Sequence, residues 1–274
     1  MRLGVFAKTF PGTDAEAVLG AVRAAGYGCA QFNMACVGLP PMPDDIPDGM
    51  LERIAAAAAR HDVGLVALSA TYNMIHPDRA IRAAGQRRLR LMLDAAKALG
   101  VPLVTLCTGT CDPDDQWRYH PGNAEPEAWA EMRREIEIAL AGAEAAGVDL
   151  GIEPEQANVV TSAADARRLI DDLGSPRLKI VLDPANLFER ATPDEARRIV
   201  AEAVDLCGAD IAMAHAKDRH ADGRFAAAGT GIVDFPDFVA RLAAGGFDGA
   251  LVTHGLSPGE APGVAVFLRD LGAS

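Results

Sequence analysis

The stretch "AAGVDLGIEPEQAN", residues 145–158, contains the unit from which the whole chain is built. An alanine-rich segment ends at Gly147, which suits the left-handed conformation that commonly closes a helix. The apolar run "VDLGIE" follows it and has the length of a buried strand. This run ends at Glu153, and Glu155 follows two residues later. The stretch predicts a helix followed by a buried strand with acidic residues at its end. A buried acid requires a partner that compensates its charge.

The same unit recurs along the sequence. The expected strands are 3–6, 29–34, 63–69, 101–107, 148–153, 178–183, 211–216 and 249–254. The expected helices are 14–25, 50–60, 78–99, 125–146, 162–173, 193–205, 235–244 and 258–271, and several open with a Ser/Thr-x-x-acid capping pattern. Eight strand-then-helix units in 274 residues predict an α/β fold, a single-domain (β/α)8 TIM barrel over residues 1–274.

A doubly wound open sheet is the alternative fold. It is disfavoured because no G-x-G-x-x-G follows the first expected strand. No linker or low-complexity tract divides the chain. The longest irregular stretches, 35–49 and 107–124, follow expected strands, and in a barrel these loops build the active site.

Composition narrows the function classes. The formal net charge of -12 opposes binding to a nucleic-acid backbone, so no nucleic-acid partner is expected. No apolar stretch approaches the roughly 20 residues that span a bilayer, and no leader pattern opens the sequence. Five cysteines without a C-x-x-C pair disfavour a disulfide framework or a zinc knuckle. We therefore expect a cytoplasmic protein with no membrane partner.

Four polar residues end the last four expected strands. They are Glu153, Asp183, His215 and His254, separated by 30 to 39 positions, close to one strand-helix unit each. Neighbouring strand ends converge in a closed barrel, so two carboxylates and two imidazoles could share one cation. Mixed oxygen and nitrogen ligands suit Mn, Co, Fe or Zn better than Ca or Mg. We expect a divalent metal ion, manganese first, with Co, Fe, Zn or Mg as alternatives.

A single acid at a strand end is more often a helix cap or part of a surface salt bridge. Four metal-ligand residue types in the same position of successive units favour the metal hypothesis over that simpler interpretation. A bound cation would also explain why Glu153 stands at the end of a buried strand, because it would neutralise the carboxylate.

The segments "LGIEPE", "IVLDPANL", "AHAKD" and "GFDGALVTHGL" resemble the strand-end signatures of the xylose-isomerase-like TIM barrel superfamily. That superfamily includes sugar phosphate isomerases and epimerases, inosose dehydratases and the apurinic endonucleases of the family 2 type. The resemblance covers nearly the whole chain. It implies that Glu153 and Asp183 are carboxylate ligands and that His215, in an H-x-K-D pattern, is the imidazole ligand. Many relatives carry a glutamate where this sequence has His254.

The resemblance implies a metal-dependent isomerase or epimerase that moves a proton next to the carbonyl of a sugar or cyclitol. In such epimerases two glutamates act on opposite faces of a metal-bound enediolate. Here Glu153 would work with His254, or with Glu155 if the strand direction continues past the proline between the two acids. Lys217 would offset the negative charge, although it could equally form an ordinary salt bridge with Asp218.

Residues of the loops after the strands are expected to bind the substrate. They are Asn73, His76, Trp117, Arg118, His120 and Asn186. An indole face beside a cation is a common arrangement for holding a sugar. The simpler alternatives are that His76 caps a helix and that Trp117 packs its loop. No motif separates phosphorylated from free sugars.

Several other functions remain open. The same site could serve an inosose-type dehydratase or a keto-glycoside lyase. A non-catalytic sugar-binding barrel is a further alternative, because His254 departs from the glutamate pair. An apurinic endonuclease is disfavoured, since Asn186 replaces a needed histidine and the net charge opposes DNA. Barrels of this kind often pair through their outer helices, so a homo-oligomer is expected.

Overall fold

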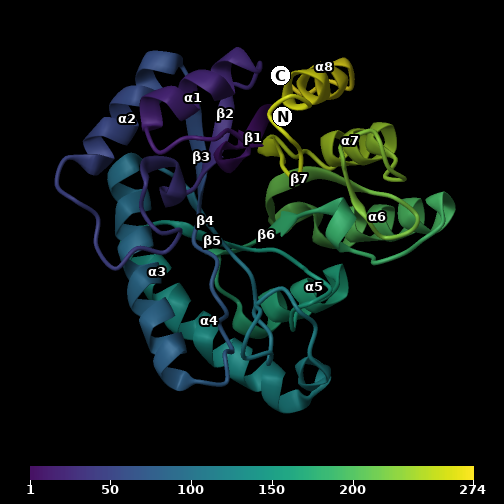
Figure 1. The fold of residues 1–274 in the computed structure, drawn as a ribbon. Coiled ribbons are helices and arrows are strands. Elements are labelled where there is room, and N and C mark those ends of the chain that lie inside the picture. Colours follow the sequence, from purple (N-terminus) through teal and green to yellow (C-terminus); the bar gives the residue numbers. More distant parts are fainter.

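A closed barrel of eight parallel strands forms the centre of the molecule (Figure 1). The computed structural model describes residues 1–274. The barrel strands are β1 (Arg2–Phe6), β2 (Cys29–Phe32), β3 (Gly64–Ser69), β4 (Leu103–Leu106), β5 (Asp149–Ile152), β6 (Leu178–Leu182), β7 (Ile211–Arg219) and β9 (Ala250–Thr253). Each pairs with the next, and β9 pairs with β1 to close the ring. The predicted (β/α)8 fold is confirmed.

Eight helices surround the barrel, one after each barrel strand (Figure 1). They are α1 (Ala15–Ala24), α2 (Met50–His61), α3 (Arg79–Leu99), α4 (Pro126–Ala146), α5 (Ala163–Leu173), α6 (Pro193–Cys207), α7 (Phe235–Ala244) and α8 (Ala261–Asp270). Thr192 and Glu195 form the capping box that opens α6, and Gly147 closes α4 with φ 75°. The capping box and the closing glycine are the local signals from which the helix ends were predicted.

Apolar side chains fill the interior of the barrel itself. A separate cluster of eight buried residues comes only from strands: Cys29, Val66, Ala67, Leu103, Val181, Met213, Ala250 and Val252. A much larger cluster of 72 buried residues packs the helices onto the outside of the strands. The apolar filling leaves the strand ends and the loops that follow them to carry the polar groups.

The two chain ends lie side by side (Figure 1). The backbone N–H of Leu3 donates to the carbonyl of Ser274 over 2.8 Å, and the N–H of Ser274 donates to Met1 over 3.0 Å. No helix has both the length and the apolar character needed to cross a membrane.

One element was not predicted. The sequence pattern ends the seventh strand at residue 216, but β7 continues to Arg219 and pairs antiparallel with a short strand, β8 (Phe225–Ala227). The carboxylate of Asp218, which is completely buried, accepts hydrogen bonds from the backbone N–H groups of Arg219, Gly229, Gly231 and Val233. Asp218 is therefore the internal anchor of the hairpin, and Lys217 lies beside it.

Replacing Asp218 by alanine is expected to lower the free energy of unfolding by about 3 kcal/mol or more, because several buried N–H groups lose their acceptor. The midpoint of thermal unfolding should fall by roughly 6–12 °C. Asp222→Ala in the same hairpin is the control, since Asp222 bonds only to Arg224 at an exposed position. Equal melting of the two variants would show that Asp218 does not anchor the hairpin.

Candidate active site

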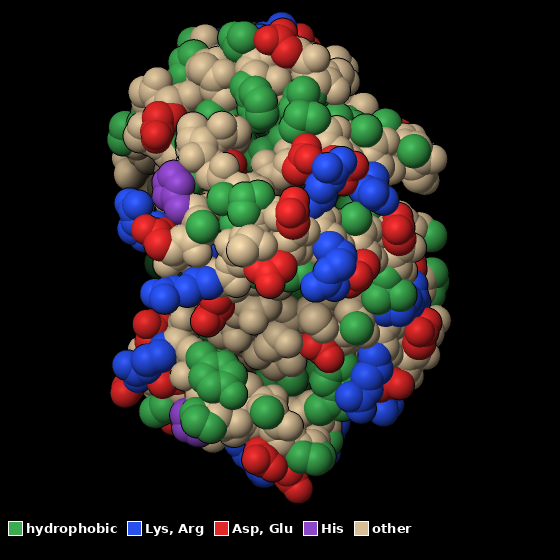
Figure 2. Space-filling model, turned by 90° about the vertical axis from the view of Figure 1, so that its right-hand side faces the viewer, with side chains coloured by type: hydrophobic (Ala, Val, Ile, Leu, Met, Phe, Trp, Pro, Cys, Tyr) green, Lys and Arg blue, Asp and Glu red, His purple; other side chains and the backbone are tan.

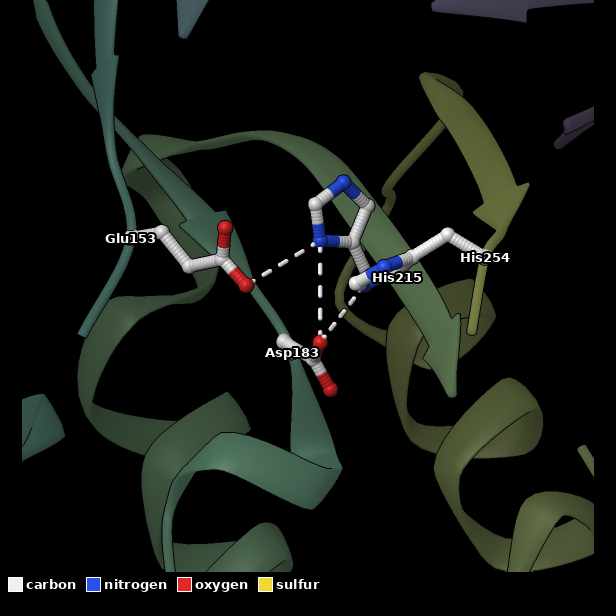
Figure 3. Close-up of side chains that lie close together, drawn as sticks. All are labelled: Glu153, Asp183, His215 and His254. Atoms are coloured by element: carbon white, nitrogen blue, oxygen red, sulfur yellow. Dashed lines mark hydrogen bonds and ion pairs between the residues drawn. The ribbon is translucent and has the colours of Figure 1, made fainter. Parts of the chain in front are cut away.

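The four residues at the strand ends meet in one cluster (Figure 3). Glu153 follows β5, Asp183 follows β6, His215 lies within β7 and His254 follows β9. Their ligand atoms all lie within 4.8 Å of one another. Twice a typical metal-ligand bond of about 2.0–2.2 Å is close to that span, so the four residues could hold one metal ion.

Each carboxylate is positioned by backbone contacts. The N–H of Glu153 donates to the carbonyl of Leu106 on β4 over 3.2 Å, which continues the ladder by one residue. Asp183 Oδ1 accepts the N–H of Ala185 over 2.9 Å, at the start of a short 3₁₀ turn (Pro184–Asn186). Its other oxygen, Oδ2, therefore faces the cluster, 2.9 Å from His254 Nε2 and 3.7 Å from His215 Nδ1.

A chain of hydrogen bonds orients the His215 ring. Gln31 Nε2 donates to Thr105 Oγ1 over 3.1 Å, which turns the Gln31 carbonyl oxygen toward His215. His215 Nε2 then donates to that oxygen over 2.9 Å. The remaining nitrogen, Nδ1, faces Glu153 Oε1 at 3.2 Å. Metal-ligating histidines usually have their other nitrogen held in this manner.

The cluster attracts positive charge. Burial alone would lower the pKa of His215, but the Glu153 and Asp183 carboxylates raise it to about 9. Burial would raise the pKa of Asp183, yet the Lys217 ammonium, 3.1 Å away, and the two imidazoles hold it well below its usual range. Burial and the neighbouring His215 lower the pKa of His254. A proton on His215 meets the same electrostatic demand that a divalent cation would meet.

Asn186 connects the cluster of Glu153, Asp183, His215 and His254 to Lys217. Its Nδ2 donates to Glu153 Oε1 over 2.7 Å, and its Oδ1 accepts from Lys217 Nζ over 2.6 Å. The Lys217 ammonium also lies 4.1 Å from the centre of the Phe225 ring. Lys217 is thus buried and forms an ion pair with Asp183, whereas the alternative taken from the sequence was an ordinary salt bridge with Asp218.

A cavity of about 460 Å³ opens over the cluster. Its walls include Phe6, Lys8, Gln31, Asn33, Pro41, Ser69, Thr71, Thr105, Gln116, Trp117, Glu153, Glu155, Asn186, His215, Lys217, Phe225 and His254. Although β5 ends at Ile152, Glu155 lines the same cavity as Glu153. Burial, and then the charge of Glu153, raises the pKa of Glu155 to about 7. Two acids therefore face one cavity.

The predicted substrate-binding residues divide into two groups. Trp117 and Asn186 line the cavity, and the Trp117 side chain is 55% exposed. Four others are not among the residues that line it: Asn73, His76, Arg118 and His120. Their side chains form hydrogen bonds within the loops, and their role in substrate binding stays a prediction.

The loop contacts of those four residues explain their placement. The Asn73 side chain bonds to the loop after β4: its Nδ2 donates to the carbonyl of Asp112, and its Oδ1 accepts the N–H of Thr110. His76 Nε2 lies 2.9 Å from the carbonyl of Pro113. Arg118 pairs with Asp112 through two hydrogen bonds of 2.6 and 2.7 Å. His120 Nδ1 accepts the N–H of Gly122, as the cap of a 3₁₀ turn (Pro121–Ala124). The other short turns are Ala7–Thr9, Met34–Val37 and Gly208–Asp210.

Sequence reasoning missed several cavity residues. Gln31 and Thr105 are polar residues inside otherwise apolar strands, and that signal could have identified them as it identified Glu153. Phe225 reaches the cavity through β8, which was not predicted, and its side chain is 50% exposed. Lys8 lies in a short turn after β1 and carries no pattern that separates it from a surface lysine.

The sequence matches the xylose isomerase-like TIM barrel family over residues 19–266, most of its length. This chain belongs to that family. The family assignment confirms the resemblance stated from the four strand-end segments. A comparison with curated protein sequences finds none with significant similarity.

Solved structures of sugar epimerases share this xylose isomerase-like barrel. The 3-keto-D-glucoside 4-epimerase from E. coli superposes with a TM-score of 0.77 at 16% identity, covering 98% of this chain and 99% of that one. An L-ribulose 3-epimerase gives 0.77 at 20% identity, covering 98% and 94%. D-psicose 3-epimerase from Clostridium cellulolyticum H10 gives 0.75 at 16% identity and covers both chains completely. At these identities the similarity establishes the fold.

Proposed function

We propose that this xylose isomerase-like barrel is a metal-dependent isomerase or epimerase that moves a proton next to the carbonyl of a sugar or cyclitol. The observation that carries the proposal is the cluster of Glu153, Asp183, His215 and His254, which lies under a cavity that also contains Glu155. The sugar epimerases among the similar structures support the same reaction class. We propose manganese as the metal, on the mixed oxygen and nitrogen donors.

The proposed roles follow from the contacts. All four residues of the cluster would be metal ligands. Asp183 and His215 are buried and would have no other role, whereas Glu153 and His254 could also take part in proton transfer. A bound divalent cation would polarise the carbonyl and the adjacent hydroxyl, which lowers the cost of negative charge on the substrate by several kcal/mol. Glu153 Oε1 is occupied by Asn186 and His215, so its other oxygen is the one that can take a proton. Glu155 or His254 would return the proton from another side of the cavity.

Lys217 would stabilise negative charge on the substrate. Its ammonium lies within the cavity wall and is held by Asp183 and Asn186. A cation that is already fixed beside the position where negative charge develops stabilises that charge without any rearrangement of the protein during the reaction. Trp117 and Phe225, both about half exposed at the cavity, would bind the apolar face of a sugar ring.

The proposal is tested by incubating the manganese-loaded protein in deuterated water with D-fructose, D-tagatose, D-psicose or L-ribulose. We expect deuterium on the carbon next to the carbonyl, measured by mass spectrometry. Turnover without any label would contradict a proton-transfer mechanism. Binding of both metal and sugar without label for any ketose would instead favour the non-catalytic sugar-binding barrel.

A nucleic-acid substrate is not favoured by the surface. The net charge is -12, and the face shown in Figure 2 carries acidic side chains interspersed among the basic ones. Phosphate backbones bind surfaces on which basic side chains dominate. We propose that the substrate is a small molecule that enters the cavity above the metal cluster.

Metal binding is expected to strengthen as pH rises. In the metal-free protein burial lowers the pKa of His215, but the Glu153 and Asp183 carboxylates raise it to about 9, whereas burial and the neighbouring His215 lower the pKa of His254. A metal must displace the His215 proton, so between pH 6 and 8 the apparent affinity for Mn²⁺ should rise by about tenfold per pH unit. Calorimetric titration with Mn²⁺ checks this, and a flat profile would exclude His215 as a ligand.

A further inference from the structure

A second cavity, of about 690 Å³, is lined in part by the same loops as the cavity over the metal cluster. Three loops each contribute residues to both cavities. Trp117, Glu155 and Asn186 line the first, whereas Tyr119, Gln156 and Glu189 line the second. Because residues close together in the same loops line the two spaces, the cavities lie on the same end of the barrel.

The second cavity offers hydrogen-bond donors that no protein group uses. Asn158 is completely buried, and its Oδ1 accepts the N–H of Gly109 over 2.8 Å, but its Nδ2 has no acceptor in the protein. The indole Nε1 of Trp129 is also buried without an acceptor. Both residues line this cavity. Buried donors are rarely left unpaired, so their position indicates a ligand rich in acceptor oxygens.

The charge of the wall excludes an anionic ligand. The cavity contains the acidic residues Glu125, Asp165 and Glu189, and Arg168 is its only basic side chain. Arg168 lies over the Trp129 ring, with its Cζ 4.0 Å from the ring centre. A phosphate or carboxylate would meet more negative than positive charge here, whereas an uncharged polyol would meet amides, carboxylates and aromatic rings that can bind its hydroxyl groups.

We propose that this second cavity is a subsite for the neutral second ring of a glycoside whose reacting ring occupies the cavity over the metal cluster. The inference rests on the proposed function for the position of the reacting ring. It specifies the substrate class as an unphosphorylated disaccharide or a larger glycoside. Trp129 Nε1 and Asn158 Nδ2 donate to oxygens of the second ring, and Tyr119, whose side chain is 52% exposed, covers one face of it.

The two tryptophans of the chain make the two cavities separately observable. Trp117 lines the cavity over the metal cluster and Trp129 lines the second cavity, and the sequence contains no other tryptophan. Protein labelled with ¹⁵N in its indole groups should give two N–H signals, and Trp117→Phe assigns them. Cellobiose and maltose are the probes, with D-glucose and D-fructose as single-ring references.

We expect one of the two disaccharides to shift both indole signals with a single apparent Kd, whereas the single-ring sugars shift the Trp117 signal alone. Trp129→Phe keeps an aromatic side chain, although a smaller one, and removes the N–H donor. It should lower the ratio of disaccharide to monosaccharide affinity by about three- to tenfold, the effect of one hydrogen bond. The conservative change should also preserve the stacking of Arg168 over this ring.

Two results would overturn the subsite. If neither disaccharide moves the Trp129 signal, its donor is satisfied by water only. If a single-ring sugar moves it as strongly as a disaccharide does, the cavity is not an extension of the reacting site. Deuterium labelling of the ketoses separates this inference from the proposed function. Labelling without a Trp129 response leaves the function intact, and a response of both indoles without labelling leaves the subsite on a non-catalytic barrel.

Discussion

Replacing Glu153 by glutamine is expected to lower the rate of deuterium incorporation into the substrate by about 10² to 10⁴-fold. The amide retains an oxygen that can accept from Asn186 Nδ2, now 2.7 Å from Glu153 Oε1, so the cavity should keep its shape. It loses the ability to take a proton. The measurement is the rate of label uptake at saturating Mn²⁺, followed by mass spectrometry.

Asp149→Asn is the matched control for this prediction. Asp149 opens the same strand, β5, at the other end of the barrel, where it pairs with Arg177 over 2.9 Å. Partly exposed pairs of this kind contribute about 0–1 kcal/mol, so the control should label substrate at the wild-type rate. Label uptake by Glu153→Gln within about threefold of wild type would mean that Glu153 is not the proton acceptor, and Glu155 would then be the candidate base.

The fold was predictable because its signals are local and repeated. Each barrel strand is a short apolar run, and helices such as α6 begin with a capping pattern and α4 ends at a glycine. The hairpin of β7 and β8 was not predictable from such signals. The hairpin is held by Asp218, whose carboxylate accepts hydrogen bonds from N–H groups of residues up to 15 positions away. A contact of that kind leaves no periodic trace in the sequence.

The meeting of Glu153, Asp183, His215 and His254 was predictable for a geometric reason. Parallel strands bring their last residues to one end of a barrel. The meeting of residues at equivalent strand positions can therefore be predicted even when the conformation of the loops is unknown. Loop side chains follow no such rule. His76 and Arg118 lie in loops that follow strands, but their polar groups bond to the backbone of Pro113 and to the Asp112 carboxylate. Only the structure shows which loop residues remain available to a substrate.

His254 stands where the resemblance drawn from the sequence implies a glutamate, and replacing His254 tests which residues carry the proposed mechanism. His254 Nε2 lies 2.9 Å from Asp183 Oδ2, inside the group of ligand atoms. We expect His254→Ala to lower the affinity for Mn²⁺ by about 100-fold or more, since a ligand should matter at least as much as the groups that orient ligands. His254→Glu should restore binding, because it returns an oxygen donor. Metal content by mass spectrometry and calorimetric titration measure both effects.

His61→Ala provides the control for His254, because it removes the same residue type where His61 bonds to Glu16 between α1 and α2, outside the barrel. If His254→Ala lowers metal binding, His254 is a ligand through Nε2, and Glu155 becomes the second proton-transfer group with Glu153. If the variant keeps its metal but no longer labels the substrate, His254 itself carries the proton. The lowered pKa of His254 permits this role near neutral pH, because a neutral imidazole can accept a proton. The two outcomes assign different residues to the role of the missing glutamate.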